Sequence, residues 1–177
     1  MMSPPRILVT GPPGSGKTTL VLRVLELLRG RHFTGFYTEE LRGRAGRSGF
    51  QLVTLDGRTA RLATVGGVAG PRVGRYTVHL PALEAVCEDV LEPRPGIDLV
   101  VIDEVGKMEC LSPAFVRSAR RVLSGPVPVL GTVAVAGGGF IAEAKRLAGV
   151  EVIPLSRENR ERLPGEVAAR LAAGLSA

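Results

Sequence analysis

The hydrophobic positions of the chain change their period along its length, and this predicts where strands and helices lie. Short apolar, β-branched runs at residues 6–10, 97–103, 127–133 and 150–155 are typical of strands. Leucine and valine recur at helical spacing over residues 17–29, and Gly30 follows where a helix C-terminal glycine belongs. Because residues 97–103 are almost wholly apolar, we expect a central parallel strand that is buried on both faces.

Further helices are predicted between these apolar runs. Pro81 begins one of them, and Ser112-Pro113 begins another that runs to Leu123, with serine as the cap and proline in the first turn. Residues 141–147 and 156–175 are also expected to be helical, the latter with a break at Pro164-Gly165. Alternation of strands and helices predicts a three-layer α/β sandwich with a mostly parallel sheet.

Residues 33–80 follow a different pattern. Residues 33–41 and 50–55 are strand-like and are separated by a turn-rich segment at 42–49. Asp56-Gly57 is a strong hairpin signal before the next strand-like run at 58–64, and residues 76–80 form another. We therefore expect a single domain, residues 1–177, that carries an antiparallel hairpin insertion over residues 33–80.

A glycine-rich segment between the first predicted strand and helix carries the clearest chemical signal. It matches the phosphate-loop pattern G-x-x-x-x-G-K-[ST] in full, in the strand–loop–helix context that the pattern requires. Glycines let backbone N–H groups turn toward phosphate oxygens, and the following helix N-terminus adds partial positive charge. The predicted nucleotide-binding residues are Gly11, Pro12, Pro13, Gly14, Ser15, Gly16, Lys17, Thr18 and Thr19.

Four side chains are expected to carry the chemistry at this segment. Lys17 would reach the β- and γ-phosphates of a nucleotide, and the Thr18 hydroxyl would ligate Mg²⁺. An apolar run ends in Asp103 and Glu104, and an acid at the end of a buried strand beside a phosphate loop has the geometry to hold Mg²⁺. Asp103 is therefore a predicted metal ligand, and Glu104 a predicted general base for the attacking water.

The pattern around these acids also distinguishes classes of phosphate-loop protein. Asp103-Glu-Val-Gly106 fits the D-x-x-G of signalling GTPases, but the guanine-reading N-K-x-D motif is absent, because the single asparagine, Asn159, precedes Arg-Glu-Arg. The single glutamine, Gln51, lies inside a predicted strand and cannot position water. The sequence therefore favours the branch that uses a catalytic glutamate.

Three further residues are candidates near the phosphates. Lys107 follows Glu104 across Gly106, and Arg160 lies after the last predicted strand, where the base or phosphates of a nucleotide could pass. Arg160 is therefore a further predicted nucleotide-binding residue, and either side chain could supply a positive charge to the transition state. The alternative for each is a surface salt bridge, Lys107 with Glu109 or Arg160 with Glu161. Thr132, at the end of the strand after Asp103, could contact the γ-phosphate or water, or could make a local turn bond.

Composition excludes several classes of protein. Hydrophobic residues make up 45% and charged residues 23%, which is ordinary globular usage. No apolar run approaches the ~20 residues of a membrane span, and the N-terminus lacks the pattern of a signal peptide. Cys87 and Cys110 form no C-x-x-C, which excludes a disulfide scaffold and a cysteine-rich zinc site and fits a reducing cytosol. A cytoplasmic protein without a membrane partner is expected.

The positive charge is concentrated in one stretch. The net charge is +6. Between Leu41 and Arg75 there are seven arginines and one acidic residue, Asp56, so this stretch alone carries a net charge of +6. The leading interpretation is a solvated arginine face on a hairpin. The alternative is a contact surface for a polyanion.

Six segments occur in an order that resembles a known family: Gly35–Arg42, Gly49–Gly57, Val73–Val78, Val101–Glu109, Leu130–Thr132 and Glu158–Arg160. The chain is similar to the small nucleoside-triphosphatase family first known from thermophiles, which includes the vertebrate cancer-related nucleoside triphosphatase. The resemblance covers about residues 6–162, and the D-E-x-G-K-M-E segment is specific to the family. Cys110, where a leucine is expected, and the glycine-rich segment after Thr132 depart from the family pattern, away from the phosphate site.

This resemblance implies a RecA-like phosphate-loop fold and slow, Mg²⁺-dependent hydrolysis of ATP, GTP and other nucleoside triphosphates to the diphosphate and phosphate. A nucleotide or small-molecule kinase is a second reading, in which the arginines of 42–75 would form a lid. A nucleic-acid-binding switch is a third, and it is disfavoured because only Phe50, with Tyr76 at the margin, interleaves with the arginines.

Overall fold

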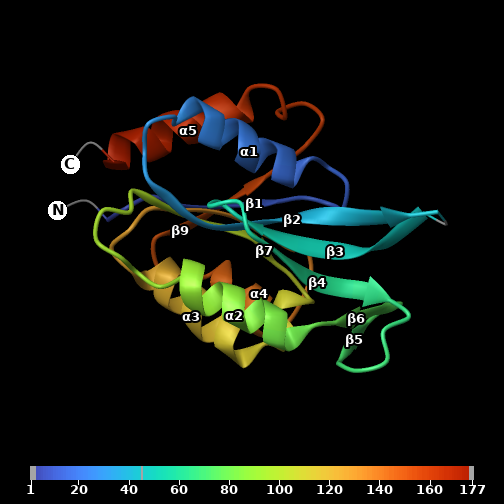
Figure 1. Ribbon diagram of the computed structural model, residues 1–177. Helices are drawn as coiled ribbons and strands as arrows, with labels where there is room; N and C mark the ends of the chain where they lie inside the picture. Colours follow the sequence, from blue (N-terminus) through green and yellow to red (C-terminus); the bar gives the residue numbers. More distant parts are fainter. Residues whose placement is uncertain (1–2, 45, 176–177) are drawn as a thin grey trace.

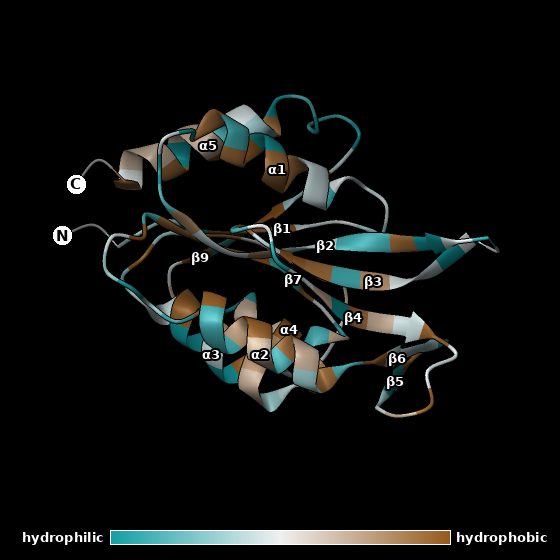
Figure 2. Cartoon of the chain, viewed as in Figure 1, coloured by the Kyte–Doolittle hydropathy of each residue, from teal (hydrophilic) through white to brown (hydrophobic). Residues whose placement is uncertain are grey.

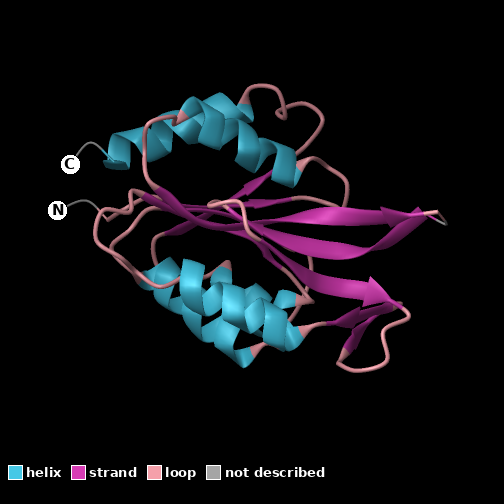
Figure 3. Ribbon diagram, in the orientation of Figure 1, coloured by secondary structure: helices cyan, strands magenta, loops and turns pink. Residues whose placement is uncertain are grey.

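The computed structural model describes residues 3–44 and 46–175 of the chain. Within them, one mixed sheet lies between two layers of helices (Figures 1 and 3). On one face lie α1 (Lys17–Leu27) and α5 (Leu163–Leu175), and on the other lie α2 (Leu80–Val90), α3 (Pro113–Ser124) and the short α4 (Gly139–Ala144). This arrangement confirms the predicted three-layer α/β fold.

The parallel half of the sheet holds the predicted phosphate loop. It has the order β2 (Phe33–Gly43), β7 (Leu99–Val105), β8 (Val129–Val133), β1 (Arg6–Thr10) and β9 (Val150–Pro154). Strand β8 therefore lies between β1, which leads into the phosphate loop, and β7, which carries the predicted acids. The carboxyl ends of the three strands meet at one edge of the sheet.

The other half of the sheet is antiparallel, as the pattern over residues 33–80 predicts. It continues from β2 through β3 (Gly46–Thr54), β4 (Thr59–Val65), β6 (Tyr76–Val78) and β5 (Arg72–Val73). Strand β2 belongs to both halves, because its first residues pair with β7 and the rest pair with β3. The hairpins therefore extend the main sheet, and the β2–β3 hairpin projects beyond the helices in Figure 1.

The expected long turn at residues 42–49 is wrong. Strand β2 runs to Gly43 and β3 begins at Gly46, so most of this segment is paired strand. Arginine and glycine are poor strand signals in a buried sheet, but the end of the β2–β3 hairpin is exposed. There Arg47 and Arg42 each form an ion pair with Glu40. The arginines of this stretch that are paired lie at the surface, which agrees with a solvated arginine face.

Two apolar cores hold the layers together, and successive residues of one strand contribute to both. On β1, Ile7 and Val9 face α1 and α5, whereas Leu8 between them faces the α2 and α3 side. Figure 2 shows this sheet as mostly hydrophobic where the helices cover it. In the second core, Phe36 of β2 meets Phe115 of α3 edge to face, with ring centroids 6.4 Å apart.

Two helix boundaries differ from the sequence expectation. The closing helix has no break at Pro164-Gly165; it begins at Leu163, with Pro164 in the first turn, where its missing N–H is not needed. Residues 157–162 form turns instead, and the Asn159 side chain within them accepts the Ser156 N–H at 2.8 Å. The preceding short helix, α4, spans 139–144 rather than 141–147, because the Arg146 N–H turns back to the carbonyl of Glu143.

The cap of α3 is confirmed and gives the first testable prediction. The Ser112 hydroxyl is buried, accepts the Phe115 N–H at 3.1 Å and donates to Glu84 at 2.8 Å. Ser112→Ala is expected to lower the free energy of unfolding by about 1–2 kcal/mol, measured by urea denaturation. The control is Ser124→Ala, since Ser124 is exposed at the other end of α3. Equal stability of Ser112→Ala and wild type would contradict the cap.

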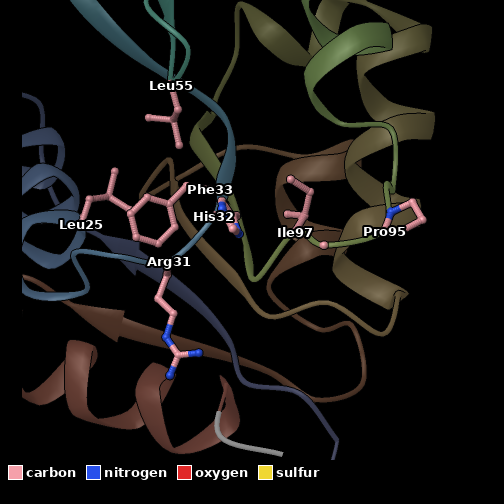
Figure 4. A pocket seen from close by; sticks show the side chains of 8 residues that line it. Leu25, Arg31, His32, Phe33, Leu55, Pro95 and Ile97 are labelled. Carbon is pink, nitrogen blue, oxygen red and sulfur yellow. The ribbon is translucent and has the colours of Figure 1, made fainter.

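A cavity of about 720 Å³ lies at the opposite edge of the sheet from the phosphate loop. Figure 4 shows Leu25, Phe33 and Leu55 together at one side of it and Ile97 and Pro95 at the other. These residues lie near the start of β2 and β7 and the end of α1. The cavity is therefore separate from the site described next. No helix among the described residues is long and apolar enough to cross a membrane.

Candidate active site

The phosphate loop connects β1 to α1 at the carboxyl edge of the sheet. Gly14 and Gly16 have positive φ angles of 75° and 95°, a backbone conformation that favours glycine. Gly16 caps α1 without any side-chain hydrogen bond, and no acidic residue lies in the first turn. The Ser15 hydroxyl is buried and has no hydrogen-bond partner among the described residues. The loop therefore offers free donors and the positive end of a helix to an anion.

Lys17 joins the phosphate loop to the acidic end of β7. Its ammonium group donates to the carbonyls of Gly11 at 2.9 Å and Pro12 at 3.4 Å. It also forms an ion pair with Glu104 Oε2 at 3.4 Å, and its side chain is only 10% exposed. A largely buried ammonium held across the mouth of the loop has the position that is needed to meet a nucleotide phosphate.

Asp103 is fully enclosed and is held by two threonine hydroxyls. The Thr18 hydroxyl donates to its Oδ2 at 2.7 Å, and the Thr132 hydroxyl donates to its Oδ1 at 2.5 Å. The Thr38 backbone N–H lies 3.4 Å from Oδ2. Burial raises the pKa of Asp103, and the hydrogen bonds from Thr132 and Thr18 oppose this rise. Asp103 therefore has a fixed orientation toward α1.

Glu104 follows Asp103 within β7, which continues for one more residue, to Val105. The β7–β8 register shifts between Ile102 and Val105, so both acids lie where the ladder is interrupted. The Glu104 side chain is 28% exposed and faces Lys17. Burial raises its pKa, which the positive charge of Lys17 opposes and the neighbouring Asp103 reinforces. A carboxylate with a raised pKa is suited to accept a proton.

The residues around Asp103 also fit a hard divalent cation. Thr18 Oγ1 and Asp103 Oδ2 are 2.7 Å apart at the mouth of the phosphate loop. Hydroxyl and carboxylate oxygens are ligands that Mg²⁺ prefers, and Mg²⁺ usually takes one or two protein ligands together with substrate phosphates and water. Thr18 and Asp103 are therefore the two protein groups that could hold the metal.

The two candidate positive charges, Lys107 and Arg160, lie in different surroundings. Lys107 is exposed and forms no hydrogen bond or ion pair with the described residues. The alternative pair with Glu109 is not formed among the described residues, since Glu109 is buried, with 5% of its surface exposed. Arg160 forms a surface ion pair with Glu161 at 3.5 Å, which is the alternative that the sequence analysis gave for this residue. A role for either residue in catalysis stays a prediction.

Lys107→Ala is expected to slow single-turnover hydrolysis at saturating enzyme by about tenfold or more, because we expect its ammonium, three residues from Glu104, to reach the transferring phosphate. Arg160→Ala is expected to change the rate by less than about threefold, since its surface ion pair is worth at most ~1 kcal/mol. Arg29→Ala, at the far end of α1, is the control for loss of surface charge. An unchanged rate in Lys107→Ala would mean that the transition-state charge comes from elsewhere.

Comparison with known proteins agrees with this geometry. Residues 6–168 match the model of the family described as NTPase. The chain belongs to this NTPase family. It is 41% identical to the cancer-related nucleoside-triphosphatase homolog of Bos taurus, over 91% of this chain and 93% of that protein. It is 38% identical to the nucleoside-triphosphatase THEP1 of Thermofilum pendens, over 97% of both chains.

A solved structure gives the same result for the fold. The solution structure of a human cancer-related nucleoside triphosphatase superposes with a TM-score of 0.80 and 37% identity, and it covers 96% of this chain and 98% of that one. The NTPase therefore has the phosphate-loop fold and hydrolyses nucleoside triphosphates, which confirms the family resemblance and the activity inferred from the motifs. The NTPase is therefore a hydrolase.

Sequence reasoning missed three contributions to this site. The bond from Thr132 to Asp103 crosses from β8 to β7, so it is neither a turn bond nor visible without the strand order. The Thr38 N–H contact comes from the antiparallel half of the sheet and carries no sequence signal. The burial of Glu109 beside Glu104 is the third. Its only sequence signal is its place in the D-E-x-G-K-M-E segment.

Proposed function

We propose that the NTPase binds ATP, GTP and other nucleoside triphosphates at residues 11–19 with Mg²⁺ and hydrolyses them to the diphosphate and phosphate. The observation that carries the proposal is a single network, in which Lys17 contacts Glu104 and Thr18 contacts Asp103. Residues 18 and 103 are 85 positions apart in the chain. They meet only because α1 and β7 converge at one edge of the sheet.

The arrangement of these groups suggests a division of labour. The loop amides and Lys17 bind the phosphates, and on nucleotide binding we expect the Lys17 ammonium to leave the Gly11 carbonyl for a phosphate oxygen. Thr132 keeps Asp103 oriented toward Thr18. When bound, Mg²⁺ would neutralise phosphate charge. Glu104, released from its ion pair, would accept a hydrogen bond from the attacking water and take its proton.

The experiment is a phosphate-release assay with ATP, GTP, CTP and UTP, each in Mg²⁺ and in EDTA, with separation of the products. The expected result is diphosphate and free phosphate from each nucleotide in Mg²⁺ and none in EDTA. Transfer of the γ-phosphate to an added acceptor would support the kinase reading instead. RNA and single-stranded DNA at low salt are added in parallel, and stimulation by either would support the nucleic-acid-switch reading.

The cellular location belongs to the same proposal. Cys87 and Cys110 are both free thiols. Unpaired thiols fit a reducing compartment, and we therefore infer that the NTPase acts in the cytoplasm, where its nucleotide substrates are abundant.

A further inference from the structure

Glu109 is a buried carboxyl group that the hydrolysis scheme does not use. It is 5% exposed and begins the 3₁₀ helix η1 (Glu109–Leu111), which leads into α3. Among the described residues no cation forms an ion pair with it. Burial raises its pKa to about 8, reinforced by Glu104 and Asp103, while backbone N–H groups of Glu109 and Gly106 oppose the rise. A buried carboxyl without a cation is costly, so its presence calls for a physical reason.

The geometry connects Glu109 to Glu104 through Gly106. A Cβ atom at Gly106 would lie 2.8 Å from Glu104 Oε1 and 2.8 Å from Glu109 Oε2. The two carboxyl oxygens therefore flank one small volume beside the Gly106 backbone, which only glycine leaves open. The other oxygen of Glu104, Oε2, faces Lys17 at 3.4 Å. Glu104 thus has one oxygen toward the phosphate site and the other toward Glu109.

The segment that carries Glu109 is firmly anchored. The Cys110 N–H donates to the Gly106 carbonyl, and the Ser112 N–H donates to the Glu109 carbonyl, both at 3.0 Å. Ser112 is in turn the buried cap of α3. Glu109 is therefore held by a helix end, whereas Glu104 is partly exposed and lies where the β7–β8 ladder is interrupted.

We propose that Glu109 is a positioning residue for Glu104: it occupies the space beside Oε1 and so keeps Oε2 directed at the phosphate site. This inference rests on the proposed role of Glu104 as general base. With no neighbour beside Oε1, the Glu104 side chain could adopt several rotamers. Only the rotamers that direct Oε2 at the attacking water are productive. Restricting the others raises the rate constant of the chemical step, whereas phosphate binding by the loop is unaffected.

The test compares Glu109→Ala, which empties the space beside Glu104 Oε1, with Glu109→Gln, which fills it. In Glu109→Ala we expect kcat to fall by about tenfold or more with KM for ATP within about threefold, and in Glu109→Gln we expect kcat within about threefold of wild type. Cys87→Ala is the matched control, because Cys87 is a buried neighbour whose truncation disturbs the packing around Glu109 without removing the carboxyl. The melting temperature of each variant shows whether a lower kcat is accompanied by a lower stability.

Glu104→Gln is assayed beside these variants. A failure of the general-base assignment of Glu104 can then be distinguished from a failure of the positioning role of Glu109. If Glu104→Gln is inactive and Glu109→Ala keeps wild-type kcat, Glu104 is essential and Glu109 does not position it. An equal loss of kcat in Glu109→Gln and Glu109→Ala would also overturn the proposal, since the amide fills the same volume as the carboxyl group. If Glu109→Ala does not fold, Glu109→Val, which also shortens the side chain, takes its place and is judged by the same criteria. An active Glu104→Gln would instead refute the assignment of Glu104, on which the proposal depends.

Discussion

Lys17→Ala is expected to abolish detectable hydrolysis and to leave the fold intact. The ammonium contacts the loop carbonyls of Gly11 and Pro12 and the carboxylate of Glu104, so no core packing depends on it. Its loss removes the positive charge that we expect to meet the transferring phosphate. Removing one preorganised donor commonly costs 10²–10³ in kcat, and because a full charge is lost here, we expect a drop of at least about 10³.

The measurement is phosphate release from ATP at saturating Mg²⁺, with circular dichroism and a melting curve to verify the fold. Arg29→Ala serves as the control, since Arg29 lies beyond the other end of α1, where its guanidinium donates to the Glu26 carbonyl. Turnover near the wild-type level in Lys17→Ala would refute the phosphate loop as the active site.

The phosphate loop could be predicted because its determinants are contiguous in the sequence. Gly14 and Gly16 adopt the positive φ angles that the motif needs, and Lys17 begins the helix. The cap of α3 was predictable for the same reason, since Ser112 bonds to the N–H only three residues later. Local chemistry decides such features, so the sequence pattern is sufficient for them.

The partners of Asp103 could not be predicted, because they depend on which strands lie side by side. Thr132 bonds Asp103 only because β8 separates β1 from β7 in the sheet, and a one-residue change of register would turn its hydroxyl to the other face. Thr38 meets the same carboxylate only because β2 continues past its last β7 partner, Phe36. Neither arrangement leaves a signal in the periodicity.

The turn predicted at 42–49 failed for a related reason. Glycine and arginine reduce strand propensity when each residue is considered alone. In the structure, Leu41 pairs with Gly49 and Arg42 with Arg47, with a register shift between them, and Glu40 provides the counter-charge for the arginines. Cross-strand pairing therefore overrides local propensity in this hairpin.

Glu104→Gln is expected to keep nucleotide binding and to lose most turnover, by about 10²–10⁴ in kcat. The amide has nearly the same shape as the carboxylate, so it retains the space beside Gly106, but it cannot accept a proton from water. Asp103→Asn is the matched comparison one residue earlier. Because Asp103 is the proposed metal ligand, we expect that variant to weaken Mg²⁺-dependent nucleotide binding instead.

The two outcomes are separated by measuring both quantities in both variants, with a fluorescent ATP analogue titrated in Mg²⁺ and in EDTA, and with phosphate release at saturating ATP. The neutral amide of Glu104→Gln also removes the ion pair with Lys17, which frees the ammonium for the phosphates and should leave the dissociation constant equal or lower. Hydrolysis at the wild-type rate by Glu104→Gln would mean that another group activates the water or that water attacks unassisted. Loss of binding in Glu104→Gln together with normal binding in Asp103→Asn would reverse the two assignments, since the side chain that holds the metal must be the one whose loss makes affinity independent of Mg²⁺.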